Sequence, residues 1–252
     1  EALLEHKPWH WLAWYLGKAR LNFEVPPDYV PAETTADHIR EVNAVVHAKN
    51  ELIDEAIGHV RDYLIARGWD DDTDIIYTTD HGELQGDFGM LFKGPYHVNA
   101  LTQVPLIWRP APASPVAPAE INDPVGHVDI APTILSRAGL AIPEWIQGSA
   151  LPTQPGEIGR DRAFTEWRDS YDNNDIVMKS MAKHDVLITK YEATNRYDGS
   201  EGELYDLNED PYQWRNLWND SNHTALRSAL LDEMQEHWPS ERDEALKKIA
   251  PV

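Results

Sequence analysis

The sequence predicts an α/β fold followed by a small antiparallel sheet and a terminal helix. The first observation is a helical pattern of apolar residues over 35–67, which leads directly into a β-branched, apolar stretch at 73–79. The second is a run of strand-like segments after residue 160, with no helical pattern between them. With 252 residues and 42% hydrophobic content, the chain is also long enough to bury a sizeable core.

The first long element is an amphipathic helix over residues 35–67. Its apolar side chains recur at steps of three and four, at Ile39, Val42, Val46, Ile53, Ile57, Val60 and Leu64. Thr34 or Thr35 is available as the N-cap, and Gly68 lies just past the end, where a glycine commonly terminates a helix. Because the start and stop signals agree with the apolar pattern, we predict a helix of this full length.

Two strands and a short helix are expected next. The segment 73–79 is short and apolar enough to be a buried strand, and 104–109 is a second strand after a glycine-containing loop. A helix follows at 129–137, with Pro132 in its first turn and Gly139 at its end. A helix that leads into a buried strand indicates an α/β layer.

The second half of the chain has a different pattern. Turn residues are frequent at 143–160, and we place a subdomain boundary there, which divides the chain into residues 1–155 and 156–252. Successive strands without intervening helices predict a small antiparallel sheet, and a helix closes the chain. The expected strands are 162–167, 177–181, 185–191 and 203–207, and the expected helix is 224–238.

The charge and composition restrict the partners of the chain. Its 22 basic and 43 acidic residues give a formal charge of −21, which argues against nucleic acid or an anionic membrane as a partner. No apolar run approaches the roughly 18 residues that a membrane-spanning helix needs. The absence of cysteine excludes disulfides and thiolate metal sites. A small anionic substrate then requires a site that concentrates positive charge locally, through a metal ion or a lysine.

Residues that carry chemistry concentrate between 78 and 97. Asp80 and His81 follow the apolar strand directly, where ligand-binding groups sit in open α/β sheets. An adjacent carboxylate and imidazole can both bind one metal ion, and the turn at Gly82 allows a close approach of the backbone. Lys93 lies in a glycine-rich loop that can fold back over the same strand end and neutralise an oxyanion. The alternatives are a capping or hydrogen-bonded surface role for Asp80 and His81, and a solvated side chain for Lys93.

Five ordered blocks over more than half of the chain resemble the C-terminal half of the sulfatases, members of the alkaline phosphatase superfamily. The blocks are TTDHGE at 78–83, Lys-Gly at 93–94, VPLIWRP at 104–110, VGHVDIAPTILSRAGL at 125–140 and ELYDLNEDP at 203–211. The resemblance implies a mixed, mostly parallel sheet flanked by helices. It also implies a smaller four-stranded antiparallel sheet with a helix in a C-terminal subdomain.

The resemblance also implies roles for individual residues. Asp80 corresponds to a metal ligand, and His81 stands where members of the family have Asn or His. Lys93 corresponds to the residue that contacts sulfate or phosphate oxygens. His97 is a further candidate for substrate contact or leaving-group protonation, with a core or surface histidine as the alternative. Family precedent favours calcium as the one divalent ion, whereas imidazole ligation suits manganese or zinc better.

The chain departs from the family pattern at the nucleophile. Active members carry a Cys or Ser, oxidised to formylglycine, in a Cys/Ser-x-Pro-x-Arg motif, and neither version is present in this sequence. We therefore expect the chain to be a fragment of a longer sulfatase that lacks its nucleophile and is inactive alone. A phosphonate monoester or phosphodiester hydrolase of the same superfamily is one alternative, and a non-catalytic interaction protein is another.

Overall fold

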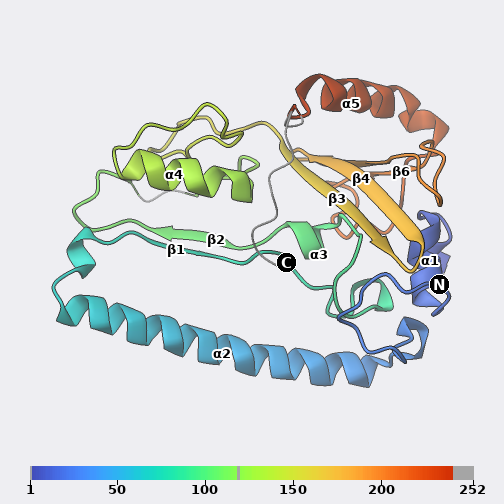
Figure 1. Ribbon diagram of the computed structural model, residues 1–252, viewed down its shortest axis with the longest axis horizontal. Helices are drawn as coiled ribbons and strands as arrows, with labels where there is room; N and C mark the ends of the chain where they lie inside the picture. The colour runs from blue at the N-terminus through green and yellow to red at the C-terminus, as the bar shows by residue number, and fades with distance from the viewer. Residues whose placement is uncertain (1, 118–119, 241–252) are drawn as a thin grey trace.

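Two antiparallel sheets organise the fold (Figure 1). A computed structural model describes residues 2–117 and 120–240. Its α-helices are α1 (Trp9–Tyr15), α2 (Ala36–Ala66), α3 (Asn99–Thr102), α4 (Ile130–Arg137) and α5 (Thr224–His237). The first sheet consists of β1 (Ile75–Thr78) and β2 (Leu106–Arg109), and the second of β3 (Ala163–Tyr171), β4 (Asn174–Ala182), β5 (Val186–Tyr191) and β6 (Gly202–Asp206).

The long helix α2 has the predicted length. Thr35 accepts a hydrogen bond from the backbone N–H of His38, whose side chain accepts one from Thr35 in return, so a capping box starts the helix. Gly68 has a φ of +71° just past its end. Much of the apolar side of α2 is exposed, since Ile53 is 46% and Val60 61% exposed, although Ile39 near the start of the helix lies against Gly86. Local signals therefore set the helix bounds, and the described residues cover its apolar side only in part.

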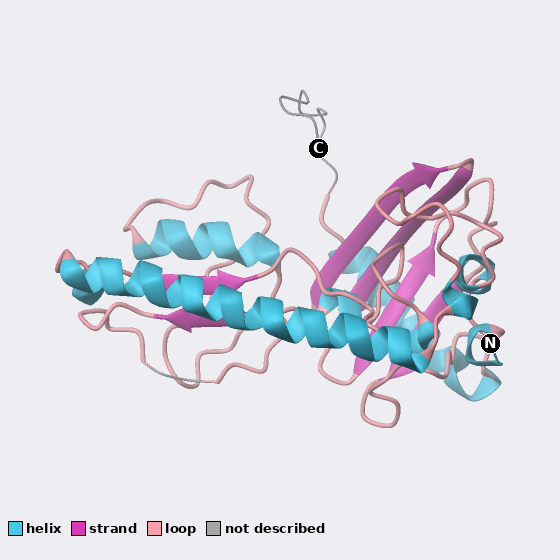
Figure 2. Cartoon of the chain, turned by 90° about the horizontal axis from the view of Figure 1, so that it is seen from below, coloured by secondary structure: helices cyan, strands magenta, loops and turns pink. Residues whose placement is uncertain are grey.

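The strands β1 and β2 form a two-stranded antiparallel ribbon in which Ile75 pairs with Arg109 and Thr78 with Leu106. The ribbon lies between α2 and α4 in Figure 1, and α2 passes in front of it when the molecule is seen from below in Figure 2. The prediction that 73–79 is a buried strand is wrong for this ribbon, because β1 is only half-buried. The described residues contain no parallel strand pair, so the mostly parallel sheet implied by the resemblance is not found among them.

The C-terminal sheet has the order β3-β4-β5-β6, with every neighbouring pair antiparallel. The four strands and α5 were predicted, although β3 and β4 are longer than expected because their hairpin continues to a turn at Asp172 and Asn173. One face packs on α5 through a core that includes Met181, Ile188 and Leu230. The opposite face covers a second core that joins the sheet to the N-terminal segment and to the loop after β1.

A buried polar network fastens the start of the chain to this opposite face. The Lys7 ammonium donates to the Tyr205 hydroxyl at 2.5 Å and lies 3.6 Å from the Glu203 carboxylate. The same carboxylate accepts hydrogen bonds from Tyr205, from Tyr191 at 2.6 Å and from the Trp11 indole at 3.1 Å. Burying a charge pair is costly unless its remaining hydrogen-bonding groups are satisfied. Here the tyrosines and the indole satisfy Glu203, so the pair holds α1 beside the sheet.

The core between the C-terminal sheet and α5 should contribute strongly to stability. Ile188 is fully buried there, and Ile188→Ala should lower the free energy of unfolding by about 2–5 kcal/mol, because it loses apolar burial and leaves a cavity. Ile158 is 93% exposed, so Ile158→Ala should change stability by less than about 0.5 kcal/mol. Urea titration of the full-length protein, followed by tryptophan fluorescence, measures both; equal values would contradict the assignment of this core.

None of the helices within the described ranges combines the length and apolar character required to cross a bilayer.

Candidate active site

The candidate site begins at the end of β1, where the chain turns sharply at Gly82. The Gly82 N–H donates to the Leu101 carbonyl at 2.9 Å, which holds this turn against α3. A Cβ atom at position 82 would lie 1.9 Å from the Ala100 carbonyl oxygen, so only glycine fits. The close backbone approach predicted for Gly82 is found, and it fixes the two preceding side chains, Asp80 and His81, at the strand end.

Asp80 and His81 place two possible metal-ligating atoms, a carboxylate oxygen and a ring nitrogen, next to each other. The Gly82 carbonyl lies 2.9 Å from Nδ1 of His81 and can only accept, so Nδ1 carries the proton and Nε2 keeps its lone pair. This Nε2 is 3.6 Å from Oδ2 of the exposed Asp80 carboxylate. Histidines that bind metals usually donate their other ring N–H to a carbonyl or carboxylate, as His81 does. Electrostatic interaction with His81, together with the hydrogen bond that its backbone N–H donates to Oδ1, lowers the pKa of Asp80.

The fit to a divalent cation is therefore good but incomplete. Asp80 and His81 supply one oxygen and one nitrogen ligand, whereas protein metal sites use four or more ligands in total. Among residues 2–117 and 120–240, no group of three or more His, Asp or Glu side chains is placed to hold a metal ion. Further ligands would have to come from solvent, substrate or other protein.

Lys93 lies in the glycine-rich loop after Gly82, which folds back toward the same site. Its ammonium forms a 2.9 Å ion pair with Glu24, and this hydrogen bond is the main cause that raises the pKa of Lys93. The Lys93 carbonyl accepts from the side chain of Asn22 at 3.0 Å, which fixes the backbone of the loop. The Lys93 side chain is one-third exposed, so its charge is available at the edge of the site.

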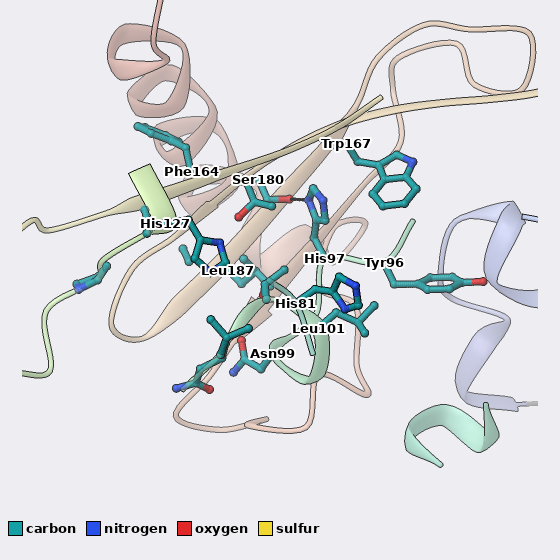
Figure 3. Close-up of a pocket in the computed structure, with 18 of the residues that line it drawn as sticks. His81, Tyr96, His97, Asn99, Leu101, His127, Phe164, Trp167, Ser180 and Leu187 are labelled. Carbon is teal, nitrogen blue, oxygen red and sulfur yellow. Dashed lines mark hydrogen bonds between the residues drawn. The ribbon is translucent and has the colours of Figure 1, made fainter. Parts of the chain in front are cut away.

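His97 lies deeper than the other three residues. It is 6% exposed, and burial lowers the pKa of its imidazole to about 4, so the ring is neutral at pH 7. Nδ1 of His97 lies 2.6 Å from the Ser180 hydroxyl of β4, and Figure 3 marks this hydrogen bond with a dashed line. This contact joins the loop after β1 to the C-terminal sheet.

All four predicted residues, Asp80, His81, Lys93 and His97, line one cavity of about 930 Å³. Its walls come from both halves of the chain, since Ser180 and other C-terminal sheet residues also line it (Figure 3). The structure brings Asp80 and His81 into direct proximity. Lys93 and His97 reach the cavity separately and contact neither of them through a hydrogen bond or ion pair.

His127 also lines this cavity and was not singled out in the sequence. Its Nε2 donates to the Thr79 carbonyl at 2.7 Å, which places a third imidazole beside the end of β1. The spacing of 48 residues gives no signal for this contact. Asp129, two residues later, has the structural role expected of its block: it is buried, caps the backbone N–H groups of Gly126 and Ser149, and pairs with Arg160.

Two protein-family models match the chain. The model described as "N-sulphoglucosamine sulphohydrolase, C-terminal" matches residues 86–239, and the model described as "Sulfatase" matches residues 22–140. Together they cover both the loop that carries the candidate site and the C-terminal sheet.

Individual proteins agree with these models. A protein of Escherichia coli K12 named "Uncharacterized sulfatase YidJ" is 28% identical over 199 residues, which cover 78% of this chain and 38% of that protein. The N-acetylglucosamine-6-O-sulfatase of Bacteroides thetaiotaomicron is 29% identical over 189 residues, 73% of this chain and 33% of that protein. The chain therefore spans 33–38% of the length of these two relatives.

A solved structure supports the fold. The phosphonate monoester hydrolase of Agrobacterium radiobacter superimposes with a TM-score of 0.72 over 82% of this chain and 43% of its own, at 24% sequence identity.

Proposed function

The chain belongs to the sulfatase family, and on this premise we propose that it forms the C-terminal part of a hydrolase that cleaves sulfate monoesters. The single cavity that gathers Asp80, His81, Lys93 and His97 carries the proposal. Its volume of about 930 Å³ suits the ester of a small organic alcohol. Lys93 and Lys183 bring positive charge to this cavity, but its lining also carries five acidic residues, Glu24, Asp80, Asp123, Glu166 and Asp169. An anionic substrate would therefore need the cation that Asp80 and His81 would hold in addition to the lysines.

Each residue has a proposed task. Asp80 and His81 hold one divalent cation through Oδ2 and Nε2, for which calcium, manganese and zinc are the candidates. A cation bound there would withdraw electron density from the sulfate oxygens. Lys93 exchanges its ion pair with Glu24 for a contact with the substrate anion and offsets the charge that develops during S–O cleavage. His97 contacts the substrate from the deeper side of the cavity.

We propose that the nucleophile comes from a part of the protein outside these 252 residues. The sequence contains no cysteine and no serine followed by Pro and Arg at the family's spacing. The exposed apolar side of α2 and the half-buried ribbon of β1 and β2 support the idea that further protein covers them. The same part would supply the missing metal ligands and the parallel strands of the sheet.

The 252-residue chain on its own should therefore hydrolyse no sulfate or phosphate ester, because covalent catalysis needs a nucleophile held against the cation. Its uncovered apolar surfaces, Val60 on α2 and Ile107 on β2 among them, should also make it prone to aggregate. The purified chain is assayed with 4-nitrophenyl sulfate and bis-4-nitrophenyl phosphate in the presence of calcium, manganese or zinc. Turnover that survives repurification and disappears in Asp80→Ala would contradict the proposed external nucleophile.

The full-length protein tests the function itself. It should turn over 4-nitrophenyl sulfate faster than bis-4-nitrophenyl phosphate or a phenylphosphonate monoester, at equal protein concentration and with the same cation. A preference for the phosphorus esters would replace sulfate hydrolysis by phosphonate or phosphodiester hydrolysis. Absence of turnover together with absence of bound metal would favour a non-catalytic interaction protein.

A further inference from the structure

A row of three buried polar groups leads from the C-terminal sheet to the cavity. Nδ1 of His97 lies 2.6 Å from Oγ of Ser180, which lies 2.7 Å from Oγ1 of Thr189. The two hydroxyl residues are each 1% exposed, and they are paired across β4 and β5. Figure 3 shows Ser180 and His97 facing each other in the cavity wall. Such a row fixes both the orientation of the ring and the place of its proton.

From this geometry we propose that Ser180 and Thr189 are positioning residues that hold the proton of neutral His97 on Nε2, where it donates a hydrogen bond to an oxygen of the substrate's sulfate group. The proposal rests on the proposed function, which supplies the anionic acceptor. It assigns to the C-terminal sheet a part in substrate binding that the sequence motifs do not indicate.

The direction of the hydrogen bonds follows from counting protons. Two hydroxyl protons need acceptors, and no other acceptor for either is found among the described residues. If Thr189 donates to Ser180 and Ser180 donates to Nδ1 of His97, both protons are satisfied. If the row runs the other way, the Thr189 proton is left buried without an acceptor, which is costly. The first direction leaves Nδ1 unprotonated and therefore places the ring proton on Nε2.

The N–H at Nε2 is available to donate a hydrogen bond to a substrate. It has no hydrogen-bond partner in the described part of the chain. It is also not one of the unpartnered polar atoms that are completely shielded from solvent, so we infer that it is accessible from the cavity that His97 lines. Burial, which lowers the pKa of His97 to about 4, keeps the ring neutral at physiological pH. A neutral N–H is a good hydrogen-bond donor but a weak acid. Of the two roles predicted for His97, the geometry therefore favours substrate contact over leaving-group protonation.

The proton position can be measured directly in the full-length protein with ¹⁵N-labelled histidine. Long-range ¹H–¹⁵N correlations, assigned by comparison with His97→Gln, should show Nε2 protonated and Nδ1 unprotonated. In Ser180→Ala the Nδ1 resonance should shift, because the nitrogen loses its donor, and in Ser180→Thr it should return toward the wild-type position. A wild-type spectrum with the proton on Nδ1 would overturn the proposal, whatever the activity.

Kinetics supply the second measurement. Ser180→Ala should raise both KM for 4-nitrophenyl sulfate and the inhibition constant of inorganic sulfate by roughly tenfold. Ser180→Thr, which keeps the hydroxyl, should remain within about threefold of wild type by the same conversion. Ser170→Ala removes an exposed hydroxyl bonded to Asp175 on the neighbouring strand and should change neither constant. Equal constants for Ser180→Ala and wild type would overturn the proposal.

The two hypotheses can fail separately. A full-length protein that hydrolyses sulfate esters but carries the His97 proton on Nδ1 retains the proposed function and loses this inference. A protein that neither hydrolyses nor binds sulfate loses the proposed function, and the substrate contact of His97 falls with it even if Nε2 is protonated.

Discussion

Asp80→Asn in the full-length protein is expected to remove most of the bound metal and to lower the turnover of 4-nitrophenyl sulfate by about 10³-fold. The amide cannot replace the charged Oδ2 that lies 3.6 Å from Nε2 of His81, so the proposed pair of ligands is lost. Metal polarisation of the transferring group contributes several kcal/mol, and about 4 kcal/mol corresponds to that factor. Elemental analysis of the purified variant and its steady-state rate measure the two losses independently.

Asp71→Asn is a suitable control, because Asp71 is also an exposed acidic residue near β1 but does not line the cavity. It should retain wild-type metal content and turnover. The fold of Asp80→Asn should remain intact, since its carboxylate is exposed and its hydrogen bonds are confined to its neighbours Thr79 and His81. If Asp80→Asn kept its metal, Asp80 would be removed from the proposed site, even if turnover fell.

Lys93→Ala should lower turnover by about 10²-fold or more, the size expected for losing one preorganised contact with a developing oxyanion. If Lys93 had only a structural role, its removal would break an ion pair and have a small effect. Its ion pair with Glu24 is partly exposed, and such pairs contribute only about 0–1 kcal/mol to stability. Glu24→Gln breaks the same pair while leaving the ammonium in place, so it should cost less than tenfold in turnover.

Comparing these two variants separates the roles. A large loss in Lys93→Ala with a small one in Glu24→Gln supports contact with the substrate. Similar losses in both would mean that Lys93 acts through its ion pair, and a loss below tenfold in Lys93→Ala would place the lysine outside the chemistry. Lys18→Ala, at an exposed lysine away from the cavity, controls for the removal of one positive charge.

The sequence alone determined the elements whose signals are local. The capping residue Thr35, the apolar period and Gly68 set the helix within one residue of the observed Ala36–Ala66. The C-terminal strands and α5 were likewise predicted, because hairpins and helices depend mainly on residues close in sequence. The strand-end position of Asp80 and His81 was predicted for the same reason, since it depends on one strand and the turn after it. The glycine at position 82 also marked a close backbone approach, although the sequence did not show that its partner is Ala100.

Only the tertiary structure decided which distant segments meet. Ser180 is 83 residues from His97 and Thr79 is 48 from His127, and no pattern within either segment specifies the contact. The half-burial of β1 and the antiparallel ribbon also depend on what packs around the strand, whereas its apolar composition alone predicted burial. Periodicity and capping act over a few residues, but strand pairing, burial and a cavity wall are formed by surfaces that the whole chain brings together.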